Sequence, residues 1–145
     1  LTLSASYTYT ITRVTNAGID SSSTANFVQG QRLLRRPATL ASATATYAFH
    51  RPATSLSAEL STVGNRDDRD FSDEITFIPK DVILPSYTVV ALAGELGILR
   101  GRGATPGLVL TARVDNLFDR SYQQIFGFAS PRRTLLVGAR VTASR

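Results

Sequence analysis

The sequence has no cysteine, a single histidine and no long apolar run. The absence of cysteine excludes both a disulfide framework and a thiolate metal site. No stretch approaches the roughly 20 consecutive apolar residues that a membrane-spanning helix needs. The lack of a long apolar run does not exclude a membrane β-barrel, because barrel strands alternate apolar and polar side chains and give only a weak hydropathy signal.

The basic charge is almost entirely arginine. The formal net charge is +5 and the isoelectric point is near 10.2, with Lys80 as the only lysine. Such a balance is compatible with nucleic acid, an anionic membrane surface or acidic ligands. The arginines are spread along the chain and do not interleave with aromatic residues as a stacking platform for nucleic acid requires. We therefore expect no nucleic-acid partner.

No group of residues predicts catalysis. The one histidine, His50, lies beside a predicted turn, and no nucleophile elbow accompanies it. No glycine-rich phosphate loop is present. The acidic run at 65–74 (NRDDRDFSDE) lacks the spacing of a calcium-binding EF-hand, and we interpret it as a solvated loop. We expect no enzyme activity, catalytic residue, cofactor or metal site.

Period-two alternation dominates the chain and predicts an all-β fold. In residues 1–15 (LTLSASYTYTITRVT), leucine, alanine, tyrosine and isoleucine alternate with serine and threonine. A strand with one apolar and one hydroxyl-rich face follows from this pattern. Similar runs predict five further strands, at 38–50, 54–64, 86–96, 108–115 and 134–143.

The lengths of the runs and of their connections favour an antiparallel up-and-down transmembrane β-barrel. The runs span about 8–13 residues, against about 5–6 in ordinary globular strands and about 9–11 in membrane strands. Long connections (16–37, 65–84, 116–131) alternate with shorter ones (50–53, 99–107), as in outer-membrane barrels. Six strands cannot enclose a lumen, so we expect residues 1–145 to form one part of a larger barrel.

The stretch near the end of the chain resembles a known family. Residues 114–119 (VDNLFD), followed by Tyr122, resemble the near-terminal NLFD-x-x-Y motif of TonB-dependent outer-membrane receptors. Residues 127–128 (GF), 131–133 (PRR) and the alternating run after them resemble the last loop and strand of that family. This loop is most similar to that of cobalamin receptors, and 33–37 (LLRRP) resembles a segment that opens an earlier strand in that subgroup.

The resemblance implies the six C-terminal strands of a barrel with about 22 strands and a plugged lumen. The family's N-terminal plug domain and TonB box are not in these 145 residues. The long loops would face outward from the bacterial outer membrane, and the turns at 51–52 and 100–106 would face the periplasm. The implied partners are membrane lipid, lipopolysaccharide, the plug, TonB through the plug, and a ligand: cobalamin or a ferric siderophore.

One feature departs from the family pattern. Barrels of this type usually end on an aromatic residue that the assembly machinery reads. Ala143 occupies the corresponding outward position here, followed by Ser144 and Arg145. The departure puts in doubt either the natural terminus or efficient assembly.

Three sets of residues are the candidate site. The expected ligand contacts in the last long loop are Phe126, Gly127, Phe128, Arg132 and Arg133, with Arg35 and Arg36 near the same rim. The expected anchors at the base of that loop are Asn116, Leu117, Phe118, Asp119 and Tyr122. The side chains expected to face the lumen and the plug are Glu59, Arg113, Asp115 and Arg140. Guanidinium groups suit phosphate and carboxylate, whereas asparagine and aspartate form turns by bonding nearby backbone.

Two other functions are compatible with the sequence. A barrel that does not use TonB, such as a porin-like channel, an adhesin or an autotransporter piece, would show the same alternation. A soluble β-sandwich that binds a ligand would also bury one face of each strand. A plug domain and TonB box upstream would favour the receptor, whereas a chain that stays monomeric without detergent would favour the sandwich.

Overall fold

The computed structural model describes residues 1–19, 22, 25, 27–51, 53–76, 78–101 and 106–142. Strands alone make up its regular secondary structure, which confirms the all-β prediction. Six of these strands form the main sheet: β1 (Thr2–Tyr9), β2 (Thr39–Ala48), β3 (Ser55–Val63), β6 (Tyr87–Leu99), β7 (Gly107–Asp115) and β10 (Thr134–Thr142). Two short hairpins are formed by β4 (Arg66–Asp70) with β5 (Lys80–Leu84) and by β8 (Gln123–Ile125) with β9 (Phe128–Ala129).

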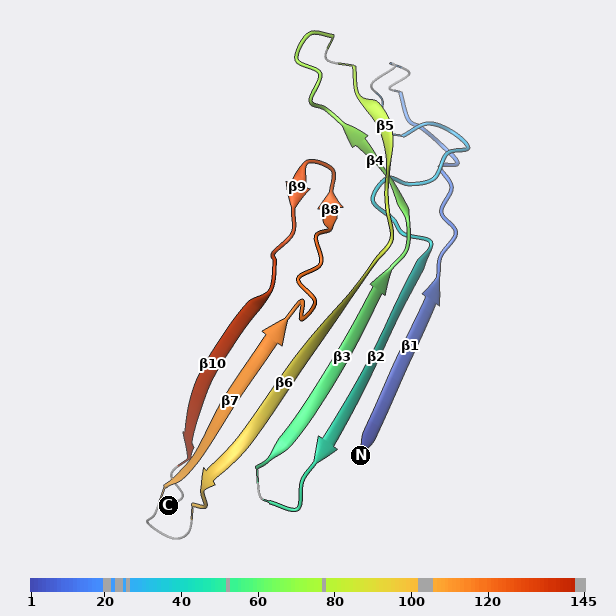
Figure 1. Ribbon diagram of the computed structural model, residues 1–145. Helices are drawn as coiled ribbons and strands as arrows, with labels where there is room; N and C mark the ends of the chain where they lie inside the picture. Colours follow the sequence, from blue (N-terminus) through green and yellow to red (C-terminus); the bar gives the residue numbers. More distant parts are fainter. Residues whose placement is uncertain are drawn as a thin grey trace.

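The main sheet is antiparallel, in the order β1-β2-β3-β6-β7-β10. Each strand pairs with its neighbour along the chain once the two hairpins are set aside, so the connections are those of a simple meander (Figure 1). The sheet is open: β1 and β10 are its edges, and they do not pair with each other within the described residues. The described strands therefore form no closed barrel by themselves, and the larger barrel stays a prediction.

The long connections all lie at one end of the sheet. Figure 1 shows both short hairpins at this end, whereas β1 begins and β10 finishes at the other. We call it the loop end, and its three connections are the first loop (10–38), the second loop (64–86) and the third loop (116–133). Phe49 N–H donates to the carbonyl of Thr54 at 3.0 Å across the short turn at the opposite end. Pro52, 102–105 and Ala143, which the sequence analysis singled out, lie outside the described residues.

Two sequence-based expectations about the loops are wrong. The first strand ends at Tyr9, not near residue 15, because the chain turns into the first loop, where Val14 is buried. The prediction of a solvated loop is wrong for the first half of the acidic run, since Arg66–Asp70 forms β4 and pairs with β5, whereas residues 71–74 lie outside the strands and are mostly exposed. The carboxylate of Asp68 is buried there because arginine and backbone N–H groups bond to it.

One face of the main sheet is apolar across all six strands. The register aligns Leu3 with Ala45, Ala45 with Ala58, and Ala58 with Leu92. Because side chains alternate along a strand, leucine, valine and alanine from the remaining strands, β7 and β10, lie on this same face. We call it the apolar face: Leu3, Ala5, Tyr7, Tyr9, Ala41, Ala43, Ala45, Tyr47, Leu56, Ala58, Leu60, Val90, Leu92, Leu96, Leu108, Leu110, Ala112, Val114, Leu135, Val137, Ala139 and Val141.

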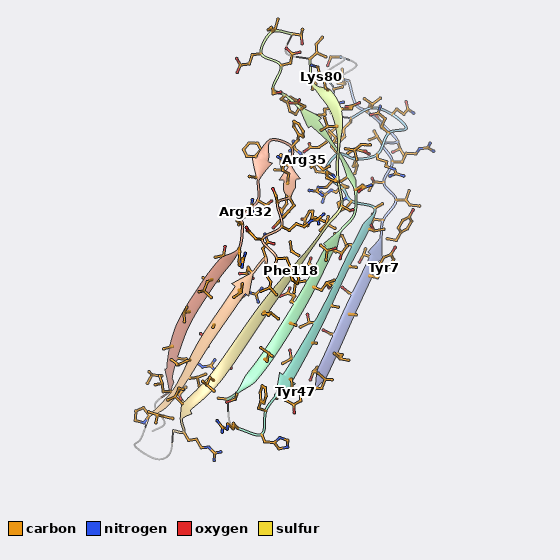
Figure 2. All side chains as sticks on the ribbon, in the orientation of Figure 1. Tyr7, Arg35, Tyr47, Lys80, Phe118 and Arg132 are labelled. Carbon is orange, nitrogen blue, oxygen red and sulfur yellow. The ribbon has the colours of Figure 1, made fainter. Side chains whose placement is uncertain are left out.

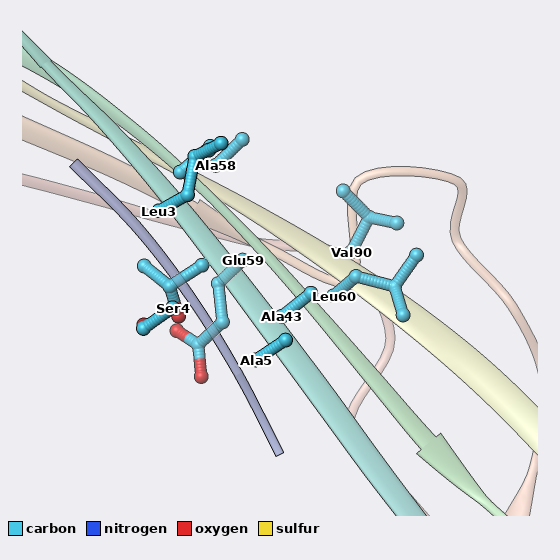
Figure 3. Close-up of a pocket in the computed structure, with 10 residues that line it drawn as sticks. Leu3, Ser4, Ala5, Ala43, Ala58, Glu59, Leu60 and Val90 are labelled. Atoms are coloured by element: carbon cyan, nitrogen blue, oxygen red, sulfur yellow. The ribbon is translucent and has the colours of Figure 1, made fainter. Parts of the chain in front are cut away.

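No side chain within the described residues covers the apolar face. Val137 is 77% exposed and Leu3 is 70% exposed. A shallow groove of about 580 Å³ crosses this face over β1, β2, β3 and β6 (Figure 3). Four alanines, Ala5, Ala43, Ala45 and Ala58, line it together with larger apolar side chains. The groove belongs to the apolar face, and Ser4, Thr44 and Glu59 also contribute to its lining.

Aromatic rings lie near both ends of the apolar face. Figure 2 places Tyr7 toward the loop end and Tyr47 toward the opposite end. The rings of Tyr47 and Phe49 meet edge to face, with 4.8 Å between their centroids. Alanine, valine and leucine fill the space between these two aromatic zones.

The opposite face of the sheet is polar and contains all the ion pairs of the main strands. Hydroxyl groups bond across neighbouring strands, as between Ser6 and Ser42 at 2.8 Å and between Thr46 and Ser57 at 2.9 Å. We call it the polar face. None of the described residues forms a helix with the length and apolar character needed to cross a membrane.

Candidate functional site

Asn116 closes the base of the third loop. Its side-chain amide donates to the carbonyls of Arg120 at 2.9 Å and Pro131 at 3.2 Å, and its Oδ1 accepts from Arg120 N–H at 2.8 Å. The backbone of Asn116 is left-handed, with φ of 50°, a conformation that asparagine tolerates better than most residues. Asn116 is buried, so it joins the two sides of the loop base.

A second link crosses the same base from Asp119 to Arg132. The guanidinium of Arg132 donates to Oδ1 of Asp119 from Nε at 2.9 Å and to Oδ2 from Nη2 at 2.7 Å. Arg133 N–H donates to Oδ1 at 2.9 Å. These bonds from Arg132 and from the Arg133 backbone hold the pKa of the Asp119 carboxyl well below its ordinary value. Arg132 is therefore held by a carboxylate, although its side chain is still 62% exposed.

The other motif residues have different positions. Leu117 N–H donates to the carbonyl of Val90 at 2.8 Å, which fixes the loop base to β6. The ring of Tyr122 stacks on Tyr87, with 4.2 Å between centroids. Phe118 is 74% exposed, so its ring is not buried by the described residues. It lies just after β7, at the base of the third loop (Figure 2).

The Phe-Gly-Phe segment forms the tip of the β8–β9 hairpin. Gly127 has φ of 81°, which a residue with a Cβ atom adopts only with strain. The two phenylalanines differ in exposure, since Phe128 is exposed and Phe126 is half-buried. Phe128 is thus available to a ligand, whereas Phe126 is held by its backbone.

Asp68 joins the three loops and was missed by the sequence analysis. Its side chain is 0% exposed. Oδ1 accepts from Arg35 Nε at 2.7 Å and from Arg69 N–H at 2.9 Å, and Oδ2 accepts from Phe126 N–H at 2.7 Å. Burial alone raises the pKa of the Asp68 carboxyl, but the bonds from Phe126, Arg35 and Arg69 outweigh burial and lower it. The carboxylate stays ionised and binds a residue from each loop.

Two buried arginines flank Asp68 on β4. The guanidinium of Arg66 lies 5.4 Å from the centre of the Tyr87 ring and donates to the carbonyls of Gln123 and, at 3.3 Å, Gln124. Arg69 Nε forms an ion pair with Asp81 at 3.2 Å. No local pattern in RDDRD predicted this strand, since the partners of its side chains lie in distant parts of the chain.

Three of the four residues predicted to face the lumen form ion pairs with one another on the polar face. Arg113 bonds Asp115 at 2.7 Å and reaches Glu59 on β3 at 3.2 Å. β6 lies between β3 and β7, and the residues it places there are Ala91 and Ala93, whose short side chains leave room for the contact. Arg140 pairs separately with Glu95 at 3.4 Å.

A cavity of about 380 Å³ lies on the polar face beneath the third loop. Its lining includes ion-paired groups from β3 and β7 and residues of the loop base: Glu59, Arg113, Asp115, Asn116, Tyr122 and Arg132. Acidic and basic groups alternate around it, so it suits a polar protein surface better than a ligand of one charge. Within the described residues, no three histidine, aspartate or glutamate side chains gather as a metal site requires.

Comparison with known proteins adds no family assignment. No protein-family model matches the chain, and a search of curated proteins finds no match either.

Proposed function

We propose that this chain is the C-terminal six-stranded part of a TonB-dependent outer-membrane receptor. Its ligand in this proposal is cobalamin or a ferric siderophore. The loop end captures the ligand outside the cell, and TonB then rearranges the plug through energy from the inner membrane. The ligand passes through the lumen that the polar face lines.

The apolar face is the observation that carries the proposal. It extends over six strands without a charged side chain and has nothing over it in the described residues. A soluble sandwich would cover such a face with a second sheet, and large exposed apolar surfaces are rare on soluble monomers. Hydrocarbon is a solvent that suits this face, and aromatic rings near Tyr7 and Tyr47 match the two interfaces of a bilayer.

The charged residues support the same orientation. Glu59, Arg113, Asp115 and Arg140 are all on the polar face. A charge on the lipid side costs roughly 2–4 kcal/mol at the bilayer midplane, so in a barrel these groups face the lumen. There they would meet the plug.

The loop end supports a capture role for the third loop. Phe128 offers an exposed apolar ring, and Arg133 donates only its backbone N–H to Asp119. Both side chains are free to meet a ligand within the described part of the chain. Asp119 holds Arg132, whereas the guanidinium of Arg133 adds a positive charge at the base of this loop.

A labelling experiment on the complete gene product tests the orientation. Ala43 and Thr44 are adjacent on β2 but point to opposite faces. Single cysteines at these positions, labelled with an environment-sensitive fluorophore, are reconstituted in vesicles that contain brominated lipid. We expect bromine to quench the label at 43 and not at 44. Equal quenching at both positions would exclude a lipid-facing apolar face.

A second experiment tests the transport assignment. The complete gene product, purified in detergent, is titrated with cyanocobalamin and separately with a ferric siderophore. Tight binding of one of them supports the receptor, whereas a gene without a plug domain or TonB box upstream excludes it. A barrel confirmed by the labels but lacking the plug would be a channel, an adhesin or an autotransporter piece.

A further inference from the structure

A second cavity at the loop end is separate from the Phe-Gly-Phe tip. Its volume is about 660 Å³, within the range of about 300–1,000 Å³ typical of small-molecule sites. Residues of the first and second loops line it: Phe27, Leu33, Leu34, Arg35, Arg36 and Phe71. We call it the inter-loop pocket. The sequence analysis noted its arginines but not its two phenylalanines.

Asp67 and Asp68 fix the position of Arg35 in the lining of the inter-loop pocket. Its backbone N–H donates to the Asp67 carbonyl at 2.7 Å, and its Nε bonds the buried carboxylate of Asp68 at 2.7 Å. Its backbone is left-handed, with φ of 60°, and its side chain is still 46% exposed. A guanidinium held at one nitrogen is pre-organised, and its outer edge stays open to the pocket.

Arg36 gives the pocket its uncompensated charge. It is exposed, and it forms no ion pair in the part of the chain that the structure describes. The lining contains two arginines and no carboxylate. Asp68 balances one of the two arginines, so the pocket keeps a positive charge.

The apolar part of the lining is unusual for a solvent-exposed loop. Phe27 is 54% exposed and Phe71 is 62% exposed, although the two loops otherwise bury Val14 and Leu84. Leu33 and Leu34 continue the apolar surface between these rings and the guanidinium groups. Rings beside guanidinium groups can stack on a planar ligand while the arginines bind its charge.

We infer that the inter-loop pocket binds a small anion with an aromatic body, such as an aromatic carboxylate or an anionic aromatic chelate. This inference rests on the proposed function in that the loop end is where the ligand arrives. It narrows the ligand class, because a charged aromatic ligand fits the pocket better than a neutral one of the same shape. The pocket itself needs neither TonB nor a lipid bilayer.

The test uses two probes that differ in charge only. 1-Naphthaleneacetate and 1-naphthaleneacetamide share one aromatic body, and equilibrium dialysis measures their binding to the complete gene product in detergent. We expect the anion to bind about tenfold more tightly, the gain typical of one charge-assisted contact. Arg36→Gln should remove most of that difference, whereas Arg51→Gln, a matched loss of charge at the opposite end of the sheet, should leave it unchanged.

The aromatic wall is tested with a separate variant. Phe71→Leu keeps an apolar side chain but removes the ring, so we expect weaker binding of both probes and an unchanged ratio between them. Equal affinity for the two probes in the unmodified protein overturns the inference, as does an Arg36→Gln protein that keeps the anion preference. If neither probe bound in an Arg36-dependent way but vesicles containing lipopolysaccharide did, the arginines would bind a lipid headgroup and the inference would fail.

Failure of the pocket and failure of the receptor proposal give different results. Suppose that lipid quenches the label at 43 and cyanocobalamin binds tightly, but the naphthalene anion is not preferred. The receptor proposal would then be supported and the anion-binding pocket refuted. An anion preference without lipid quenching would support the pocket and refute the receptor proposal.

Discussion

Phe126 N–H donates a 2.7 Å hydrogen bond to Oδ2 of Asp68, although 58 residues separate them in the chain. The other oxygen of the same carboxylate accepts from Arg35 at 2.7 Å. One buried side chain of the second loop therefore holds the first and third loops. The carboxylate of Asp68 thus connects all three loops at this end.

Asp68→Asn should loosen this coupling. The amide keeps one acceptor but turns a donor toward Arg35 or Phe126, and a buried group left without a partner costs about 1–3 kcal/mol. We expect faster hydrogen exchange in 33–36 and 122–129, with the main strands unchanged, measured by mass spectrometry. Asp67→Asn, next to it on β4, is the matched control and should have little effect. Unchanged exchange in Asp68→Asn would show that the loops hold together without the carboxylate.

Acid should release the loops in the unmodified protein. Because the folded protein lowers the pKa of Asp68 from its ordinary 3.8, the carboxylate contributes stability above that value and loses it as pH falls through the lower folded pKa. Exchange in 122–129, corrected for intrinsic rates, should be constant from neutral pH to about pH 4 and rise below it. Asp68→Asn should be insensitive to pH over this window. A loop that opens equally in both proteins would point to another titrating group, such as Asp119.

Asn116 gives a prediction about backbone conformation. Asn116→Gly keeps an easy left-handed φ but loses the side-chain bonds to Arg120 and Pro131, at a cost of about 1–3 kcal/mol in the free energy of unfolding. Asn116→Ala loses the same bonds and adds about 1 kcal/mol of backbone strain. Urea unfolding in detergent micelles should rank the proteins asparagine, glycine, alanine. Equal stability of the two variants would show that the φ of 50° carries no strain.

A charge placed on either face of β2 should have opposite consequences. Ala43→Arg puts a guanidinium on the apolar face, where a bilayer would penalise it by roughly 2–4 kcal/mol. Thr44→Arg puts the same group on the polar face, with Glu59 as its cross-strand partner. We expect only Ala43→Arg to reduce folding into vesicles, followed by the gel shift between unheated and heated samples. A similar loss in both variants would argue against lipid on the apolar face.

The sequence alone predicted the main sheet because its signal is local. Alternation within each run sets which side chains share a face, so Glu59, Arg113 and Asp115 could be placed on one face from the sequence, but the contact between them could not. The strand 86–96 was ambiguous, because both of its faces are partly apolar. The structure resolves this: Val90 and Leu92 lie on the apolar face, and the small residues Ala91 and Ala93 lie under the ion pairs.

The loop end could not be predicted in the same way. An aspartate in a charged run is expected to be exposed, but Asp68 is buried because it bonds residues 33 and 58 positions away in the chain. No local pattern in the sequence identifies these partners. Arg132 had seemed available to a ligand because its carboxylate partner, Asp119, is 13 residues away. A single sequence shows which side chains carry charge, but which charges neutralise one another depends on how the loops fold.

The directions of the two edge strands decide whether an even or an odd number of added strands could close this sheet into a barrel. β1 runs toward the loop end and β10 runs away from it (Figure 1). A strand added antiparallel to β10 must run toward the loop end, and the last strand added, beside β1, must run away from it. Strands inserted between the edges must therefore alternate in direction from first to last, so their number is even. An odd number would force one parallel pair, and with it a crossover connection from one end of the sheet to the other.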